Sequence, residues 1–199
     1  MRDFRAELAG DKCWDRVTEA LVAEHGEPLE DAILQNREEL IGLCELIERE
    51  RIESYLEIGV WTGALVRTLH RLFRFRTVAA CDQGYAETLG LAIRLPDGAR
   101  FFRGNSESDG FQRFRAALGH VDLTLVDANH AHHAVARDFA INRAHPHRFL
   151  AFHDITGGRR QTTGVARFWR ELEGDKLEIV RPHRELDAAS TMGIGVWRS

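Results

Sequence analysis

The chain has 199 residues, a hydrophobic content of 44%, a charged content of 29% and a formal net charge of −4. These totals are typical of one globular domain with a sizeable core. The weakly acidic balance, without a basic block, does not suggest a nucleic-acid-binding protein, and no apolar run approaches the roughly 20 residues of a membrane span.

The cysteines and the N-terminal residues indicate the cellular compartment of the protein. Cys13, Cys44 and Cys81 lie in apolar stretches and show no pair spacing, which is typical of reduced, buried thiols. Residues 1–5 contain no apolar segment like that of a secretory signal. We therefore expect a cytoplasmic protein.

The first part of the chain is predicted to be an extension of the domain. Residues 1–27 are polar and irregular, with one helix expected over 14–25. Pro28 suits the first turn of a helix, where its missing N–H costs nothing, and apolar residues recur at helical spacing over 29–50. We expect residues 28–199 to form a single domain.

After this helix, strand patterns alternate with helix patterns. The expected strands are 55–59, 77–81, 99–102, 121–126, 147–152, 176–180 and 191–197. The expected helices are 64–73, 86–93, 111–118, 131–142 and 165–172. Alternation of this kind predicts a parallel, doubly wound sheet with right-handed crossovers. No helix pattern separates the last two strands, so we expect them to pair antiparallel.

The predicted fold is therefore a Rossmann-like α/β fold. Its seven-stranded sheet is mostly parallel with a C-terminal antiparallel strand, and helices cover both faces in a three-layer α/β/α arrangement. Ligands of such sheets bind at the carboxyl ends of the strands. Packing alone does not explain the residues predicted there, which are Glu57, Gly59, Asp82, Asn105, Asp127, His153 and Asp154.

The turn after the first sheet strand resembles a nucleotide-binding turn. Gly59 and Gly63 let the backbone approach a ligand, and Glu57 can bind an amino group. The next strand ends in Asp82, whose carboxylate can accept hydrogen bonds from both hydroxyls of a ribose. The G-x-G-x-x-G pattern of dinucleotide sites is absent. The structural alternative is a plain turn, with Asp82 as a helix cap.

Four further residues extend this candidate adenosine site. Gln83 follows Asp82 and is expected beside the adenine, whereas Trp61 is expected at the opening. Asn105 and Ser106 follow the third strand, where they can meet the adenine or ribose or cap the next helix.

A cluster of acids and histidines is predicted between the fourth and fifth strands. Asp127 and His130 follow one strand, and His153 and Asp154 end the next. The cluster can hold a divalent cation through Asp127, His153 and Asp154, or it can supply a histidine as a general base. Carboxylates suit Mg²⁺, whereas imidazole also suits transition metals. The alternative is that the acids cap helices and the histidines pack.

Motifs spread in order along the chain carry a family resemblance. They are Leu-Glu-Ile-Gly at 56–59 with Gly63, Arg-Gly-Asn-Ser at 103–106, Val-Asp-Ala-Asn-His at 126–130 continuing to Asp138, Phe-His-Asp-Ile at 152–155 followed by 164–169, and Met-Gly-Ile-Gly at 192–195. With these motifs, residues 28–198 resemble the class I S-adenosylmethionine-dependent methyltransferases. The nearer likeness is to small-molecule and sugar O-methyltransferases and cephalosporin hydroxylase-like proteins. The chain departs from that group at Ala128, Asn129 and His132, and at His153, where related metal-dependent enzymes have an acid.

The resemblance implies methyl transfer from S-adenosylmethionine to a small hydroxylated molecule, such as a sugar or natural product. Cofactor binding would involve Glu57, Gly59, Trp61, Gly63, Asp82, Gln83, Asn105, Ser106 and Asp127. Catalysis would involve Asp127, His130, His153 and Asp154, with Asp127, His153 and Asp154 as ligands of Mg²⁺ or a transition metal. We expect no nucleic-acid or membrane partner, and a homo-oligomer stays open.

Two other functions fit the same sequence. His130, His153 and Asp127 approximate a two-histidine, one-carboxylate iron site, which would suit a metal-dependent hydroxylase-like enzyme. A non-catalytic S-adenosylmethionine-binding protein would keep the cofactor turn alone. In a methyltransferase or a hydroxylase, the loop at 159–161 (Arg-Arg-Gln) could close over an anionic substrate.

Overall fold

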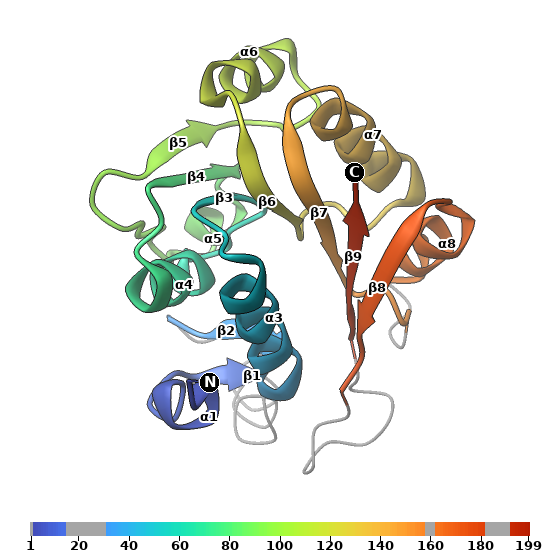
Figure 1. Ribbon diagram of the computed structural model, residues 1–199. Helices are drawn as coiled ribbons and strands as arrows, with labels where there is room; N and C mark the ends of the chain where they lie inside the picture. The colour runs from blue at the N-terminus through green and yellow to red at the C-terminus, as the bar shows by residue number, and fades with distance from the viewer. Residues whose placement is uncertain (1, 15–30, 158–161, 182–191) are drawn as a thin grey trace.

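The computed structural model describes residues 2–14, 31–157, 162–181 and 192–199 (Figure 1). A seven-stranded sheet has the order β5-β4-β3-β6-β7-β9-β8. Its strands are β3 (Ser54–Ile58), β4 (Thr77–Asp82), β5 (Arg100–Arg103), β6 (Val121–Val126), β7 (His147–His153), β8 (Asp175–Ile179) and β9 (Ile194–Arg198). Strands β3 to β7 pair in parallel, whereas β9 runs antiparallel to both β7 and β8. This confirms the predicted sheet.

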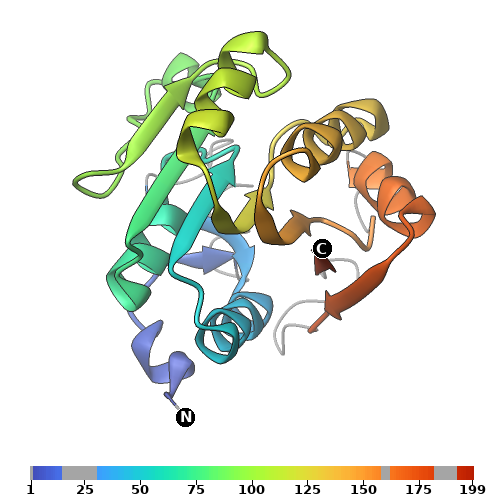
Figure 2. The ribbon, with the colours of Figure 1, turned by 45° about the horizontal axis from the view of Figure 1, so that its top comes forward.

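Helices cover both faces of this sheet, as expected for three layers (Figure 2). They are α3 (Arg37–Glu50), α4 (Ala64–Phe73), α5 (Tyr85–Thr88), α6 (Asp109–Leu118), α7 (His132–Arg143) and α8 (Thr163–Glu171). Leu43 of α3 and Leu69 of α4 share a core with Tyr55 of β3. The next residue of that strand, Leu56, faces a second core with Val135 of α7. Successive residues of a strand point to opposite faces, so both faces of β3 are buried.

The predicted helix over 29–50 is wrong at its beginning. Residues Ile33–Asn36 form strand β2, which pairs in parallel with β1 (Cys13–Trp14) as a separate two-stranded sheet. Helix α3 begins only after Asn36, because the side-chain oxygen of Asn36 accepts the N–H of Glu38 and caps the helix. Apolar spacing alone did not distinguish this short buried strand from a helix.

Two other helices of the prediction differ from the structure. Trp14, expected at the start of the helix over 14–25, lies in β1, and the rest of that helix falls outside the described residues. The helix expected over 86–93 is reduced to α5, which ends before Gly90. Gly90 has a φ of 79°, a left-handed conformation that ends the helix there.

The described N-terminal residues pack on the domain. Phe4 of the short helix α1 (Phe4–Glu7), Leu8 and Cys13 belong to the same core as α3 and α4. The cysteines are free and buried, as predicted. Among the helices in the described ranges, none combines the length and apolar character needed to cross a bilayer.

Candidate cofactor and cation site

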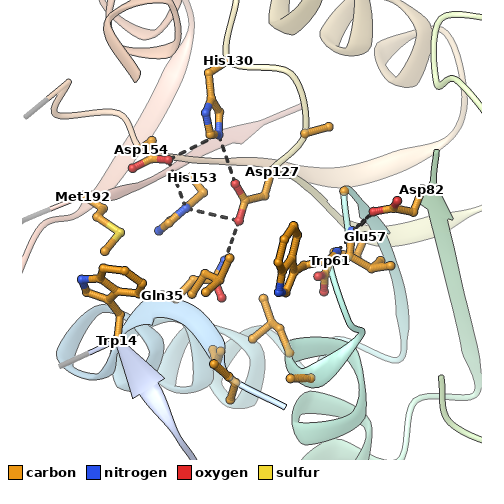
Figure 3. Close-up of a pocket in the computed structure, with 18 of the residues that line it drawn as sticks. Trp14, Gln35, Glu57, Trp61, Asp82, Asp127, His130, His153, Asp154 and Met192 are labelled. Carbon is orange, nitrogen blue, oxygen red and sulfur yellow. Dashed lines mark hydrogen bonds and ion pairs between the residues drawn. The ribbon is translucent and has the colours of Figure 1, made fainter. Parts of the chain in front are cut away.

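A cavity of about 470 Å³ opens at the carboxyl ends of the parallel strands (Figure 3). Strands β3, β4, β6 and β7 and the residues directly after them supply most of its polar residues, which include Glu57, Asp82, Gln83, Asp127, His130, His153 and Asp154. The N-terminal strands and the segment before β9 supply a largely apolar wall of Trp14, Ala32, Ile33, Leu34 and Met192. The cavity therefore has a polar edge on the sheet and an apolar cover.

The glycine turn after β3 is shaped by close backbone contacts. A Cβ atom on Gly59, which has a φ of 85°, would lie 2.0 Å from the carbonyl oxygen of Asp127. A Cβ atom on Gly63 would lie 2.2 Å from the carbonyl oxygen of Arg94. Gly59 lines the cavity, whereas Gly63 caps the start of α4. Both positions need glycine because the backbone of another segment occupies the side-chain position.

Asp82 holds this turn against β4. Its Oδ2 accepts the backbone N–H groups of Val60 at 2.8 Å and Trp61 at 3.2 Å, and its Oδ1 accepts that of Gly84 at 2.6 Å. Each carboxylate oxygen has more than one acceptor site, so the group can bind a ribose hydroxyl as well. Asp82 thus lines the cavity, and its hydrogen bonds join the end of β4 to the turn after β3.

Glu57 is a buried acid at the floor of the cavity. The hydroxyl of Tyr55 donates to its Oε2 at 2.6 Å. Burial raises the pKa of Glu57 to about 8, and the negative charges of Asp127 and Asp82 act in the same direction. A cationic amino group entering the cavity would offset both effects, so Glu57 is suited to bind one.

The remaining predicted cofactor residues divide into two groups. Trp61 and Gln83 line the cavity, and the ring of Trp61 lies 5.9 Å from that of Tyr85. The structure does not bring Asn105 and Ser106 into the cavity. The side-chain oxygen of Asn105 accepts the N–H of Glu107 at 2.8 Å, and Ser106 is buried.

The predicted acid–histidine cluster is assembled. His130 Nε2 lies 3.4 Å from both Asp127 Oδ1 and Asp154 Oδ2. His153 Nδ1 lies 3.3 Å from Asp127 Oδ2 and 3.6 Å from Asp154 Oδ2. Ligand atoms of Asp127, His153 and Asp154 all lie within 4.8 Å of one another. Two carboxylates and an imidazole at this spacing fit a divalent cation.

Opposite charges dominate the cluster. Burial opposes the ionisation of Asp127, but the charges of His153 and His130 hold the pKa of Asp127 well below its usual range. Burial likewise opposes protonation of His153, yet Asp127 and Asp154 outweigh it and raise the pKa of His153 to about 9. A hydrogen bond with Asp127 raises the pKa of His130. Positive charge is therefore stabilised here, whether it is a proton or a cation.

Gln35 is a site residue that the sequence did not reveal. It lies in β2, is buried, and donates from Nε2 to Asp127 Oδ2 at 2.5 Å. The segment had been predicted as helix, which would have given Gln35 no fixed place relative to Asp127. The available signal was an amide after the short apolar run 32–34, directly followed by a second amide, Asn36, and this signal is too weak to locate a site.

His132 and Trp169 lie outside the acid–histidine cluster. His132 of α7 contacts Glu171 of α8 at 2.7 Å, and Trp169 is buried in the core. The loop 159–161 falls outside the described residues.

Comparison with known proteins identifies the fold. No protein-family model matches this sequence, and no curated protein sequence matches it. Solved structures do match. An O-methyltransferase from Bacillus cereus, solved in complex with SAH, has a TM-score of 0.58 and 14% identity over 96% of this chain and 94% of that chain.

Two further matches are methyltransferases of biosynthetic pathways. TomG, an O-methyltransferase from Streptomyces achromogenes solved with SAM, has a TM-score of 0.56 and 15% identity over 95% of this chain and 92% of its own. MycE from the mycinamycin pathway, solved with Mg and SAH, has a TM-score of 0.52 and 16% identity over 92% of this chain and 54% of its own. The chain therefore has the Rossmann-like fold of the class I O-methyltransferases.

Proposed function

We propose that the protein is an S-adenosylmethionine-dependent O-methyltransferase that acts on a small hydroxylated molecule. The observation that carries the proposal is one cavity with an adenosine-type turn at one end and an acid–histidine cluster at the other. Structural neighbours solved with SAM or SAH support the choice of cofactor.

In this proposal, the β3–β4 end of the cavity binds the cofactor. Asp82 accepts hydrogen bonds from the ribose hydroxyls, Glu57 binds the amino group of the methionine part, and Gln83 lies beside the adenine. Gly59 and Gly63 shape the turn, and Trp61 covers it. Asn105 and Ser106 would contribute only through the loop after β5, since neither lines the cavity.

The β6–β7 end would then carry the chemistry. An O–CH₃ bond forms as the S–CH₃ bond of the sulfonium breaks, and the hydroxyl proton must leave. His130 is the better base, because its side chain is 28% exposed and can pass the proton to water, whereas that of His153 is 3% exposed. Asp127 and Asp154 orient His130 and stabilise its charge.

The same residues would hold a divalent cation. Asp127, His153 and Asp154 form the ligand set, and a bound cation would lower the pKa of a coordinated hydroxyl. MycE was solved with Mg, which supports a cation for this chain. His130 remains beside the ligand set, in contact with both aspartates.

The apolar cover favours one kind of acceptor. Trp14 and Met192 lie on the far side of His153 from Asp82 (Figure 3). Ile33 and Leu34 extend this wall. An acceptor with an apolar face beside its hydroxyl would bury that face here, which favours a natural product over a free sugar.

A metal-dependent hydroxylase is the second candidate. It is favoured by the two imidazoles of His130 and His153, which both contact Asp127. A hydroxylase would consume oxygen and require iron, whereas a methyltransferase would convert S-adenosylmethionine to S-adenosylhomocysteine without oxygen. A non-catalytic binding protein would do neither.

Calorimetric titration with S-adenosylmethionine and with NAD tests the proposal. Each titration is run after chelation and again with added Mg²⁺. Saturable binding of S-adenosylmethionine and none of NAD is expected, with binding weakened in Asp82→Ala. No binding of S-adenosylmethionine under either condition would refute the proposed function.

A further inference from the structure

Glu39 is a buried acid to which the proposed methyl transfer assigns no role. It lies in the first turn of α3 and is 0% exposed. Its Oε1 accepts the backbone N–H of Gly193 at 2.9 Å. The backbone N–H of Arg181 also lies near this carboxylate and lowers its pKa, but Oε2 is buried and makes no hydrogen bond of normal geometry within the described part of the chain. A buried carboxylate oxygen without a donor is costly, so a missing partner is indicated.

His153 also has a buried polar atom without a hydrogen-bond partner in the described ranges. Its Nδ1 faces Asp127 and Asp154, whereas its Nε2 is buried and makes no hydrogen bond in the described ranges. Figure 3 shows this second ring nitrogen turned away from Asp127, toward Met192. Each group thus has a buried polar atom that could satisfy the other.

The two groups are neighbours across the β7–β9 pair. His153 is paired with Ile194 in that ladder, and the residue before Ile194 is Gly193, which binds the Glu39 carboxylate. Burial raises the pKa of Glu39 to about 7 although the charge of His153 lowers it, and the charge of Glu39 raises the pKa of His153. The two groups therefore lie close enough for their charges to interact.

We propose that Glu39 is a positioning residue for His153, to which it is joined by one bridging water molecule. The water accepts the proton of His153 Nε2 and donates to Glu39 Oε2, so both buried atoms gain a partner. His153 then keeps its proton on Nε2 when a cation is bound, and the Nδ1 lone pair faces Asp127 and Asp154.

This arrangement deepens the cation part of the proposed function and rests on it. A ligating imidazole needs its other nitrogen hydrogen-bonded to fix the ring and the tautomer, and loss of such a partner weakens metal binding by about 10- to 100-fold. Asp127 and Asp154 approach His153 from the Nδ1 side, and we assign the support of Nε2 to Glu39.

The chemistry explains why an acid is needed at position 39. Glu39 must accept on both oxygens, one from Gly193 and one from the water on His153. Glutamine has a single acceptor oxygen, so Glu39→Gln can keep the bond from Gly193 and the fold, but its NH₂ group cannot accept the hydrogen bond that the water on Nε2 donates.

Nuclear magnetic resonance of the histidine ring protons provides the direct test. The full-length protein is measured at pH 8 without metal, with Glu39→Gln as the variant and Glu38→Gln as the control. Glu38 is the adjacent residue but pairs with Arg5 at the surface. A protected Nε2–H signal of His153, assigned through His153→Asn, is expected in wild type and control and should be lost in Glu39→Gln. A signal that persists in Glu39→Gln, or that is absent from wild type, overturns the proposal.

Titration with Mg²⁺ alone provides a second readout. Glu39→Gln should bind about 10- to 100-fold more weakly than wild type, with Glu38→Gln unchanged. Equal affinities for all three overturn the role of Glu39 in cation binding. If wild type binds no Mg²⁺, the cation part of the proposed function fails, and the ring-proton signal still decides whether Glu39 positions His153.

Discussion

The two ends of the cavity are built in different ways. At the cofactor end, the main bonds join neighbouring strand ends, and Asp82 accepts backbone N–H groups from the turn after β3. At the catalytic end, side chains bind groups from remote segments. Gln35 lies 92 residues from its partner Asp127, and Glu39 lies 154 residues from Gly193. The first end is a local backbone motif, whereas the second exists only when the N-terminal strands and β9 are in place.

Removal of the Asp127 charge should produce the largest difference between an effect on turnover and an effect on cofactor affinity. We expect Asp127→Asn to lower turnover by roughly 10²- to 10⁴-fold, because the base and the cation lose their common carboxylate. Cofactor affinity should change less than tenfold. Steady-state kinetics and calorimetry measure the two effects.

Asp122→Asn is the matched control for that prediction. Asp122 lies near the other end of the same strand, where its carboxylate accepts the N–H groups of Glu53 and Ser54. This variant should affect stability and leave turnover unchanged. If both variants lose turnover equally, the distinction between the two ends is wrong.

The pKa values of Asp138 and Asp127 are shifted in opposite directions, and the shift of Asp138 makes stability depend on pH. Burial raises the pKa of Asp138 to about 6, whereas the histidines lower that of Asp127. The folded pKa of Asp138 exceeds its unfolded value, so its contribution is fully present below about pH 4 and is lost as pH rises through about 6. Asp138→Asn should therefore gain up to roughly 3 kcal/mol over wild type between those values.

Urea unfolding at pH 4.5 and pH 8 measures this gain. Asn can still accept the hydrogen bond of Ser106, so the packing around position 138 should be kept. A stability difference between variant and wild type that is the same at both pH values would contradict the assignment.

The cofactor end should respond to the loss of Asp82 with a smaller effect. Asp82→Ala leaves the N–H groups of Val60, Trp61 and Gly84 without their acceptor and removes the proposed ribose partner. We expect the affinity for S-adenosylmethionine to fall by about 10- to 100-fold. Calorimetry gives the value, and an unchanged affinity would assign Asp82 to the turn alone.

The smallest expected effect compares two glutamines, one at each end. Gln35→Leu removes the donor to Asp127 and should lower kcat by about fivefold, equivalent to about 1 kcal/mol. Gln83→Leu should instead raise the KM for S-adenosylmethionine and leave kcat unchanged. If the two variants changed the same constant, the ends would not act separately.

The sequence predicted the sheet and most strand ends because their signals are local. The buried strands β3 and β6 were found within one residue of their observed bounds. The residues Asp127, His130, His153 and Asp154 were expected together because parallel strands end at the same edge. Their assembly in contact follows from that topology.

The sequence failed where a segment takes its structure from distant partners. Strand β2 is held by pairing with β1, and its apolar residues fit a helix equally well. The wrong helix hid Gln35. Asn105 was expected either to meet the adenine or ribose or to cap the next helix, and the structure shows its side-chain oxygen accepting the N–H of Glu107.

The sequence by itself thus determined the Rossmann-like order of elements, the glycine turn and the residues at the strand ends. All of these depend on periodicity and spacing within short segments. Only the tertiary structure decided the apolar cover, the bond from Gln35 to Asp127 and the burial of Glu39. These contacts join residues far apart in the chain, and burial and charge act through space, so no local pattern records them.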